Sequence, residues 1–241
     1  MRIADRTVLV TGANRGIGQA LVEEALTRGA KRVYAGTRKP LGHSDTRVTP
    51  VALDVTDAAQ IQAAAEIVES LDVLVNNAGL GLYDDLGDRA ALEQHLAVNL
   101  FGTYGMTQAF VPHVTRSQGA IVNVLSVAAL ASVPVLPAYS ISKAAAFSLS
   151  QSLRALLASR GVSVHAVLAG PVDTDMTRGL DLPKVSSESV ARGIFDGVEN
   201  GEDEIFPDPF SGSIAESWRG GPAKALEREN AALVQAQALA S

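Results

Sequence analysis

Short, nearly continuous apolar runs alternate along the chain with longer stretches whose apolar residues recur at helical spacing. An apolar run without polar alternation is typical of a strand buried on both faces of a parallel sheet. The longer stretches predict amphipathic helices that pack on those faces. The predicted strands are Thr7–Thr11, Arg32–Gly36, Val48–Leu53, Val73–Asn76, Ala120–Leu125, Val162–Leu168 and Glu204–Phe206. The predicted helices are Ile17–Arg28, Asp57–Glu69, Arg89–Thr115, Tyr139–Ser159 and Ser187–Asn200.

This order of elements predicts an α/β fold: a doubly wound parallel sheet of about seven strands with helices on both faces, as in Rossmann-like proteins. We expect a single domain over residues 1–241, because no linker interrupts the pattern. The polar segment 38–46 leaves little room for a helix between the second and third strands. Residues 207–241 are predicted to form a C-terminal extension. Its last part, 220–241, begins with Gly-Gly-Pro and carries an apolar stripe, which predicts a helix.

Composition narrows the possible partners. Hydrophobic residues make up 47% of the chain and charged residues 19%, which fits a packed core rather than a disordered chain. The net charge of −6 provides no basic surface, so we expect no nucleic-acid partner. The absence of cysteine excludes disulfides, thiolate metal ligands and cysteine nucleophiles. No metal site is predicted, because metal-ligand spacing is lacking among His43, His95, His113 and His165.

The termini and a few isolated residues suggest no further chemistry. No signal-peptide pattern precedes the first strand, and no apolar run reaches transmembrane length, so we expect a cytoplasmic protein without a membrane partner. His43 and His165 are interpreted as structural residues in a loop and a strand. Trp218 is interpreted as a packing or interface anchor. The acidic run Glu199–Glu204 is predicted to be a solvated turn.

Glycines mark the turn from the first strand into the first helix. Gly12, Gly16 and Gly18 would permit a tight turn and let a phosphate approach the positive end of the helix. Their spacing differs from the common G-x-G-x-x-G pattern, so on its own the motif fits either a dinucleotide site or a plain glycine-rich turn.

Two polar motifs follow apolar strands further along the chain. The strand Val73–Asn76 runs into Asn77, Ala78 and Gly79, where amides can lock neighbouring loops and small residues leave space for a flat ligand. Tyr139 and Lys143 stand four residues apart in a predicted helix, so a phenol and an ammonium group share one helix face.

Together these motifs resemble the short-chain dehydrogenase/reductase family in its compact single-domain form. The resemblance covers about residues 5 to 206, in order along the chain. It rests on Thr11-Gly-x-x-x-Gly-x-Gly18, Asp54 in LDVTD, Asn76-Asn-Ala-Gly79, Asn99 in VNLFG, Ser126, Tyr139-x-x-x-Lys143 and Gly170-x-Val-x-Thr174. One position departs from the family: Ala169 stands before Gly170, where relatives usually carry proline.

The resemblance implies an oxidoreductase that interconverts a carbonyl and an alcohol. It assigns Tyr139 as general acid/base, and Lys143 as a ligand of the nicotinamide ribose that also lowers the tyrosine pKa. A free tyrosine, with a pKa near 10, is poorly matched to neutral pH, and a neighbouring ammonium favours its phenolate. Ser126 would hydrogen-bond the carbonyl oxygen, and Asn99 would anchor a water that extends the proton relay from Lys143.

The end of the second strand predicts the cofactor. An acidic residue there would accept hydrogen bonds from the ribose of NAD, but this chain has Thr37 followed by Arg38, with Arg15 in the glycine loop. Two guanidinium groups can bind a 2′-phosphate, so NADP (NADPH) is favoured. The predicted cofactor residues are Gly12, Asn14, Arg15, Gly16, Ile17, Gly18, Thr37, Arg38, Asp54, Val55, Asn77, Ala78, Gly79, Tyr139, Lys143, Gly170, Val172 and Thr174.

The family's substrate pocket maps onto a mostly aliphatic set of residues. No lysine or arginine is placed among them to meet a carboxylate or phosphate, which predicts a neutral ketone, aldehyde or secondary alcohol. Residues 175–190 are predicted to form a substrate lid. The predicted lining is Leu80, Tyr83, Ser126, Val127, Val133, Leu136, Met176 and Leu180.

Two other functions stay open. A reductase of 3-oxoacyl thioesters on a carrier protein would favour a basic patch near the site, where Thr177–Ser187 offers only Arg178 and Lys184. A non-catalytic dinucleotide-sensing regulator on this fold would typically lack the Tyr139/Lys143 pair. Family members are commonly dimers or tetramers, so we expect a homodimer or homotetramer.

Overall fold

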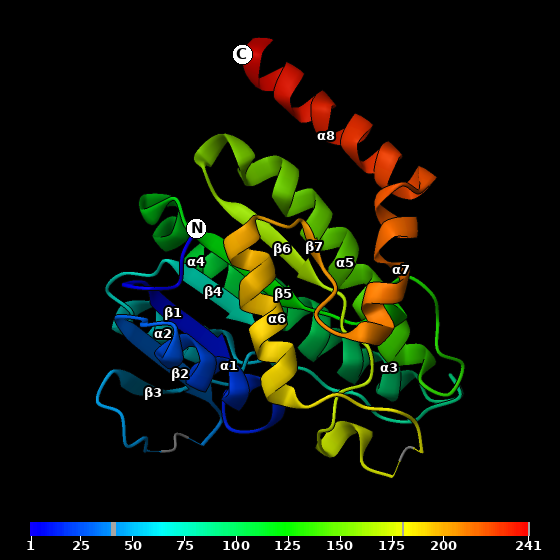
Figure 1. Ribbon diagram of the computed structural model, residues 1–241, viewed down its shortest axis with the longest axis horizontal. Helices are drawn as coiled ribbons and strands as arrows, with labels where there is room; N and C mark the ends of the chain where they lie inside the picture. Colours follow the sequence, from blue (N-terminus) through cyan, green and yellow to red (C-terminus); the bar gives the residue numbers. More distant parts are fainter. Residues whose placement is uncertain (40–41, 180, 241) are drawn as a thin grey trace.

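A computed structural model of the chain describes residues 1–39, 42–179 and 181–240. Within these residues, parallel strands form one seven-stranded sheet in the order β3-β2-β1-β4-β5-β6-β7 (Figure 1). The predicted strands all occur, and their ends move by no more than one residue. They are β1 (Thr7–Thr11), β2 (Arg32–Thr37), β3 (Val48–Ala52), β4 (Val73–Asn76), β5 (Ala120–Val124), β6 (Ser163–Val167) and β7 (Glu204–Ile205).

Helices connect the strands and extend the chain beyond the sheet. The α-helices are α1 (Gly16–Thr27), α2 (Ala58–Ile67), α3 (Arg89–Leu96), α4 (Thr103–Ser117), α5 (Pro137–Leu157), α6 (Ser187–Asn200), α7 (Pro209–Arg219) and α8 (Pro222–Ala240). Shorter turns of helix are η1 (Ala97–Gly102), η2 (Val127–Ala129), η3 (Ala158–Arg160) and η4 (Asp175–Thr177). No helix in the described part of the chain has the length and apolar character needed to cross a bilayer.

Alternation along the strands divides the core into two layers. Val8 and Val10 of β1 belong to the cluster that α1 and α6 complete, whereas Leu9 belongs to the opposite cluster with residues of α2, α4 and α5. Figure 1 shows α1 and α6 in front of the sheet, with α2, α4 and α5 behind it. The strands are therefore covered on both sides, as their continuous apolar runs predicted.

The long helix predicted over 89–115 has an irregular middle. It consists of α3, a π-helical stretch η1 and then α4. Asn99 lies within η1, and its side chain is bonded to other parts of the chain rather than to its own helix. A π-bulge often occurs where a helix presents a functional side chain, and hydrophobic periodicity alone does not reveal it.

The C-terminal extension contains a helix that the sequence pattern missed. Asp208 caps α7 by accepting a hydrogen bond from the backbone N–H of Ser211, and Pro209 occupies the first turn. This Asp-Pro start is a recognisable N-terminal signal. Trp218 in the last turn of α7 packs on Phe147 of α5, and Figure 1 shows α8 running away from the sheet to the C-terminus.

The prediction of a solvated turn over Glu199–Glu204 is wrong for its last residue, Glu204. Glu204 is only 3% exposed and pairs with Lys224 of α8 at 2.9 Å and with Arg154 of α5 at 2.8 Å. Lys224, itself 2% exposed, also bonds Asp203 and Glu227. The charge run reads as solvent-facing only because the helix that covers it comes later in the chain.

Two sequence predictions involve residues that the structure does not describe. Leu180, predicted to line the substrate pocket, lies outside the described residues. The segment 38–46 contains no helix in the residues that are described, 38–39 and 42–46.

Candidate active site

The predicted cofactor residues lie along one edge of the sheet, because they stand at the carboxyl ends of parallel strands. The strand order reverses between β1 and β4, and this switch point is where open parallel sheets bind ligands. From β1 come Gly12, Asn14, Arg15, Gly16, Ile17 and Gly18, and from β2 come Thr37 and Arg38. Asp54 and Val55 follow β3; Asn77, Ala78 and Gly79 follow β4; and Gly170, Val172 and Thr174 follow β6.

The turn from β1 into α1 requires glycines. Gly12 and Gly16 have φ angles of 65° and 53°, in the left-handed region that glycine adopts without strain. A Cβ on Gly18 would lie 2.1 Å from the carbonyl oxygen of Gly12 and 2.5 Å from Nδ2 of Asn77. The residues at this turn therefore fit a pyrophosphate, which could approach the helix N-terminus closely.

Asparagines at the end of β4 fix the neighbouring loops. Asn77 Nδ2 donates to the carbonyl oxygen of Thr11 at 2.9 Å, and Thr11 Oγ1 accepts from the backbone N–H of Asn77 and Ala78. Asn76 Nδ2 donates to Asn123 Oδ1 at 2.9 Å, which joins β4 to β5. These contacts agree with the predicted role of the Asn-Asn pair in locking adjacent loops.

Helix α5 presents the phenol and the ammonium group that share one face. Pro137 at its first turn begins the helix, and Tyr139 and Lys143 follow on successive turns. Lys143 is only 5% exposed, and its Nζ donates to the carbonyl oxygen of Val124 at 2.9 Å. The same Nζ lies 5.7 Å from the centroid of the Tyr139 ring. The ammonium group is thus held between the end of β5 and the tyrosine.

Desolvation dominates the acid–base properties of this pair. It raises the pKa of Tyr139 to about 12, against a smaller opposite effect of the hydrogen bond with Ser126. It lowers the pKa of Lys143 to about 8. The sequence led us to expect a lowered tyrosine pKa, so the direction found here is the opposite one. The reason is that loss of hydration disfavours the phenolate and the ammonium group alike.

Asn99 is a buried junction rather than a free amide. Its Oδ1 accepts from the backbone N–H of Leu80, and its Nδ2 donates to the carbonyl oxygen of Leu80, all at 2.8 Å. Nδ2 also donates to Ser142 Oγ at 2.8 Å, and Ser142 Oγ donates to the carbonyl oxygen of Tyr139 at 2.7 Å. The side chain of Asn99 therefore connects the loop after β4 to the first turn of α5.

The loop after β6 completes the site opposite the glycine turn. A Cβ on Gly16 would lie 3.1 Å from Thr174 Cγ2, so these two segments touch. The backbone N–H of Gly170 donates to Asp208 Oδ2 at 2.8 Å, which fixes the loop where Ala169 replaces the usual proline. Val172 forms an isolated parallel bridge with Val185. Sequence reasoning missed Asp208, because its partner is thirty-eight residues away.

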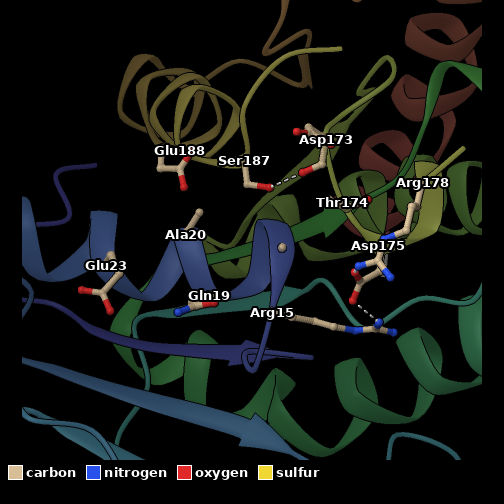
Figure 2. Close-up of a pocket in the computed structure, with 11 residues that line it drawn as sticks. Arg15, Gln19, Ala20, Glu23, Asp173, Thr174, Asp175, Arg178, Ser187 and Glu188 are labelled. Atoms are coloured by element: carbon tan, nitrogen blue, oxygen red, sulfur yellow. Dashed lines mark hydrogen bonds and ion pairs between the residues drawn. The ribbon is translucent and has the colours of Figure 1, made fainter. Parts of the chain in front are cut away.

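An ion pair links the glycine loop to the predicted lid. Arg15 Nη1 lies 2.7 Å from Asp175 Oδ2, and Arg178 pairs with the other oxygen of Asp175. Figure 2 shows Arg15 and Asp175 facing each other beside Thr174, along a polar cleft of about 480 Å³. The two arginines lower the pKa of Asp175 and keep it ionised.

The end of β2 offers no carboxylate to a ribose. Thr37 is buried, and its Oγ1 donates to the carbonyl oxygen of Lys39 at 2.9 Å, whereas Arg38 is exposed. Asp54 holds its own turn by accepting from the backbone N–H and the hydroxyl group of Thr56. Val55 is buried against Gly102.

The predicted substrate residues lie on several segments, and one of them, Tyr83, lines a cavity. Tyr83 and Pro137 line an open cavity of about 840 Å³ together with Asp84, Asp85, Leu86, Ser132, Pro134 and Val135. A Cβ on Gly81 would lie 2.9 Å from Met176 Sδ, so Met176 reaches the segment that begins at Leu80. Leu136 precedes the first residue of α5, and Val133 donates its backbone N–H to Ser140. Ser126 caps η2, and Val127 is its first residue.

His95 is a further side chain at the site, and sequence reasoning set it aside. It is fully buried, and its ring meets the ring of Tyr139 edge-on at a centroid distance of 6.5 Å. The available signal was its position four residues before Asn99 on one helix. Elsewhere in the described residues, histidines, aspartates and glutamates do not gather in groups of three that could hold a metal.

Comparison with protein families identifies the chain. The model of the short chain dehydrogenases matches residues 6–184. The chain belongs to the short-chain dehydrogenase/reductase family. A curated relative, a short-chain dehydrogenase of Penicillium crustosum, is 42% identical over 182 residues, which are 70% of this chain and 66% of that protein. The match thus spans slightly less than two thirds of the relative's length.

Solved short-chain dehydrogenase/reductase structures share the fold. A short chain dehydrogenase from Burkholderia cenocepacia in complex with NADP has a TM-score of 0.87 and 37% identity, covering 95% of this chain and 98% of that one. An NADPH-bound carbonyl reductase from chicken fatty liver has a TM-score of 0.78 and 27% identity, covering 84% and 96%. A 3-ketoacyl-(acyl-carrier-protein) reductase from Brucella melitensis, complexed with NADH, has a TM-score of 0.78 at 22% identity, covering 85% and 97%. The last match shows the fold alone.

Proposed function

We propose that this protein is an NADP(H)-dependent oxidoreductase that interconverts neutral ketones or aldehydes and their alcohols. The observation that carries the proposal is the arrangement on α5: a buried Tyr139 phenol whose pKa is raised, with Lys143 held one helical turn away by the carbonyl oxygen of Val124. This arrangement stands at the strand edge where the residues fit a dinucleotide.

The residues divide the chemistry of carbonyl reduction between them. When bound, NADPH supplies the hydride that the carbonyl carbon accepts. Ser126 Oγ hydrogen-bonds the substrate oxygen, and Tyr139 gives its proton to that oxygen as the carbon–oxygen double bond is reduced. Because the pKa of Tyr139 lies near 12, the phenol is protonated at neutral pH and ready to donate. Lys143 then favours the phenolate that is left behind.

The preference for NADP rests on the charges at the end of β2. A buried Thr37 replaces the acid that would bind the ribose of NAD, and Arg38, which is exposed, would meet a 2′-phosphate. Two relatives solved with NADP or NADPH are in line with this choice.

The cofactor assignment predicts an asymmetric effect of one charge reversal. Arg38→Asp is expected to weaken NADPH binding about ten- to a hundredfold, because a charge-assisted contact to the 2′-phosphate is lost. NADH lacks that phosphate, so its binding should change far less. Fluorescence titration of both cofactors measures this difference, and equal losses would show that Arg38 does not select the cofactor.

The open cavity lined by Tyr83 and Pro137 supports a neutral substrate. Its lining is more apolar than polar, and its charged side chains are Asp84 and Asp85. These carboxylates repel anions, and an anionic substrate would find no cationic partner among the lining residues. The same charges disfavour 3-oxoacyl chains delivered by an acidic carrier protein. A non-catalytic sensor would have no need for the Tyr139/Lys143 pair in this setting.

A substrate panel tests the proposed function. NADPH oxidation at 340 nm is followed with neutral aryl-alkyl and aliphatic ketones, with oxo acids of matched size and with 3-oxoacyl thioesters. We expect the highest kcat/KM for the neutral compounds. Much higher values for oxo acids or thioesters would overturn the substrate assignment, and cofactor binding without any turnover would favour the sensor.

We also propose that the protein is a homodimer or homotetramer. Large apolar side chains remain exposed on α4 and its π-helical start, where Phe101 is 62% and Tyr104 is 48% exposed. Others are exposed on α5, where Ile141 is 42% and Leu156 is 56% exposed. Light scattering after size-exclusion chromatography gives the mass, and a monomer at micromolar concentration would contradict the proposal.

A further inference from the structure

His95 makes two hydrogen bonds that fix its protonation and its orientation. It lies in the last turn of α3 and is completely buried. Nδ1 lies 2.7 Å from the carbonyl oxygen of Ala91, and Nε2 lies 3.0 Å from the backbone nitrogen of Leu82. A backbone N–H can only donate, so Nε2 is the acceptor and the proton is on Nδ1. The imidazole is therefore neutral, with both ring nitrogens engaged.

The hydrogen bond to Leu82 is one of two supports that hold the segment 80–83. The other is Asn99, which bonds the backbone N–H and C=O of Leu80. His95 and Asn99 are four helical residues apart, a rise of about 6 Å, and Leu80 and Leu82 are separated by about 6.6 Å of extended chain. The two spacings match, so this stretch of helix holds alternate residues of the segment.

The segment 80–83 forms one wall of the predicted substrate pocket. Gly81 abuts the lid, because a Cβ there would lie 2.9 Å from Met176 Sδ. Tyr83 lines the open cavity beside α5. On its other side, His95 meets the Tyr139 ring edge-on, with the ring planes at 74°. One buried side chain thus contacts both the pocket wall and the proton donor.

We propose that His95 is a positioning residue for substrate binding: it holds segment 80–83 at a fixed distance from Tyr139 and the lid. This inference rests on the proposed function. His95 and Asn99 therefore have different roles. Asn99 also bonds Ser142, and through Ser142 it is connected to the backbone of Tyr139. The contacts of His95 are with Ala91, Leu82 and the Tyr139 ring, so we expect its removal to affect binding of the ketone more than binding of the cofactor.

Two substitutions of His95 separate hydrogen bonding from simple filling of space. His95→Leu fills the buried volume but leaves the N–H of Leu82 without an acceptor. His95→Gln keeps one acceptor and one donor. We expect His95→Leu to raise KM for a neutral ketone about tenfold, with kcat within about threefold and the NADPH dissociation constant unchanged. His95→Gln should restore KM to within about threefold of the wild-type value.

A third variant changes segment 80–83 itself, at its contact with Met176. Gly81→Ala introduces a Cβ against Met176 and leaves His95 in place. We expect it to raise KM in the same way, so the inference stays testable even if His95→Leu does not fold. Control titrations of NADPH fluorescence should give wild-type dissociation constants for every variant.

Hydrogen–deuterium exchange provides a readout that does not depend on turnover. In His95→Leu, the peptide covering 80–83 should exchange faster than in the wild type, and His95→Gln should return it toward the wild-type rate. If the wild type reduces no compound in the panel, the proposed function fails, while the exchange rates still decide the role of His95. Unchanged exchange or unchanged KM in His95→Leu, or an equal loss of NADPH affinity, overturns the inference.

Discussion

At the scale of single residues, loss of hydration sets the chemistry of the site more than the neighbouring charges do. Tyr139 and Lys143 stand where the family motif places them, yet burial moves both pKa values toward the neutral forms, to about 12 and about 8. A phenol that keeps its proton is suited to giving it to a carbonyl oxygen, as the proposed reduction requires.

The first residue-scale prediction concerns the proton donor. Tyr139→Phe removes the hydroxyl group and preserves the ring that packs against His95. General acid catalysis contributes on the order of 10²–10⁴-fold, so kcat should fall by that factor. NADPH should still bind with near wild-type affinity, which a fluorescence titration checks. Near-normal turnover by this variant would remove Tyr139 from the mechanism.

The second residue-scale prediction concerns pH. Because the lowered pKa of Lys143 is about 8, the ammonium group is present below that pH and is lost above it. The kcat/KM for ketone reduction with saturating NADPH should therefore be level near pH 7 and fall above about pH 8. In Lys143→Arg the cation stays charged, so whatever activity remains should not fall in this range. A wild-type profile that is flat up to pH 10 would contradict this assignment.

At the scale of elements, an ion pair joins the glycine loop to the predicted lid. Asp175 holds Arg15, and both side chains are well exposed, at 42% and 64%. Exposed ion pairs contribute little, about 0.2–1 kcal/mol, so the contact can exchange readily. Under the proposed function, Arg15 would be shared between Asp175 and a cofactor phosphate.

If Asp175 competes with the cofactor for Arg15, removing the Asp175 carboxylate should change NADPH binding. Asp175→Asn should release Arg15 and tighten NADPH binding by up to about fivefold, the equivalent of an exposed ion pair. NADH, without the 2′-phosphate, should gain less. Glu188→Gln, which removes a charge from the same cleft without touching Arg15, is the matched control. Weaker NADPH binding in Asp175→Asn would mean that the ion pair supports the cofactor instead of competing with it.

At the scale of the whole molecule, a buried charge cluster fastens the C-terminal helix to the sheet. Lys224 of α8 lies among three carboxylates, those of Asp203, Glu204 and Glu227, at distances of 2.9–3.1 Å. Arg154 of α5 pairs with the same three carboxylates. The last strand, α5 and α8 are thus joined by charges that have little access to water, apart from Asp203, whose side chain is 52% exposed.

This cluster predicts a large cost for losing one partner. Lys224→Met should lower the free energy of unfolding by about 3 kcal/mol, because buried carboxylates lose a cation that compensates them. Arg228→Met, at an exposed position of the same helix, should change it by less than about 0.5 kcal/mol. Urea denaturation monitored by the fluorescence of Trp218, which packs on Phe147 near α8, measures both. Equal stabilities of the two variants would show that the cluster does not hold α8 in solution.

The sequence by itself determined the sheet, the order of its elements and the turn-by-turn pairing of Tyr139 with Lys143. These features depend on local patterns: continuous apolar runs for buried strands, helical spacing for amphipathic helices and glycines for a tight turn. The π-helical stretch at Asn99 and helix α7 left weaker local traces and were missed.

Only the tertiary structure decided the contacts, the burial and the pKa shifts of individual side chains. It placed His95 between the pocket wall and Tyr139, buried Glu204 beneath a later helix, and turned the pKa of Tyr139 upward. Each of these depends on which distant segments come together and how much water they exclude. Desolvation is a property of the packed assembly, so residue types and spacing along the chain do not report it.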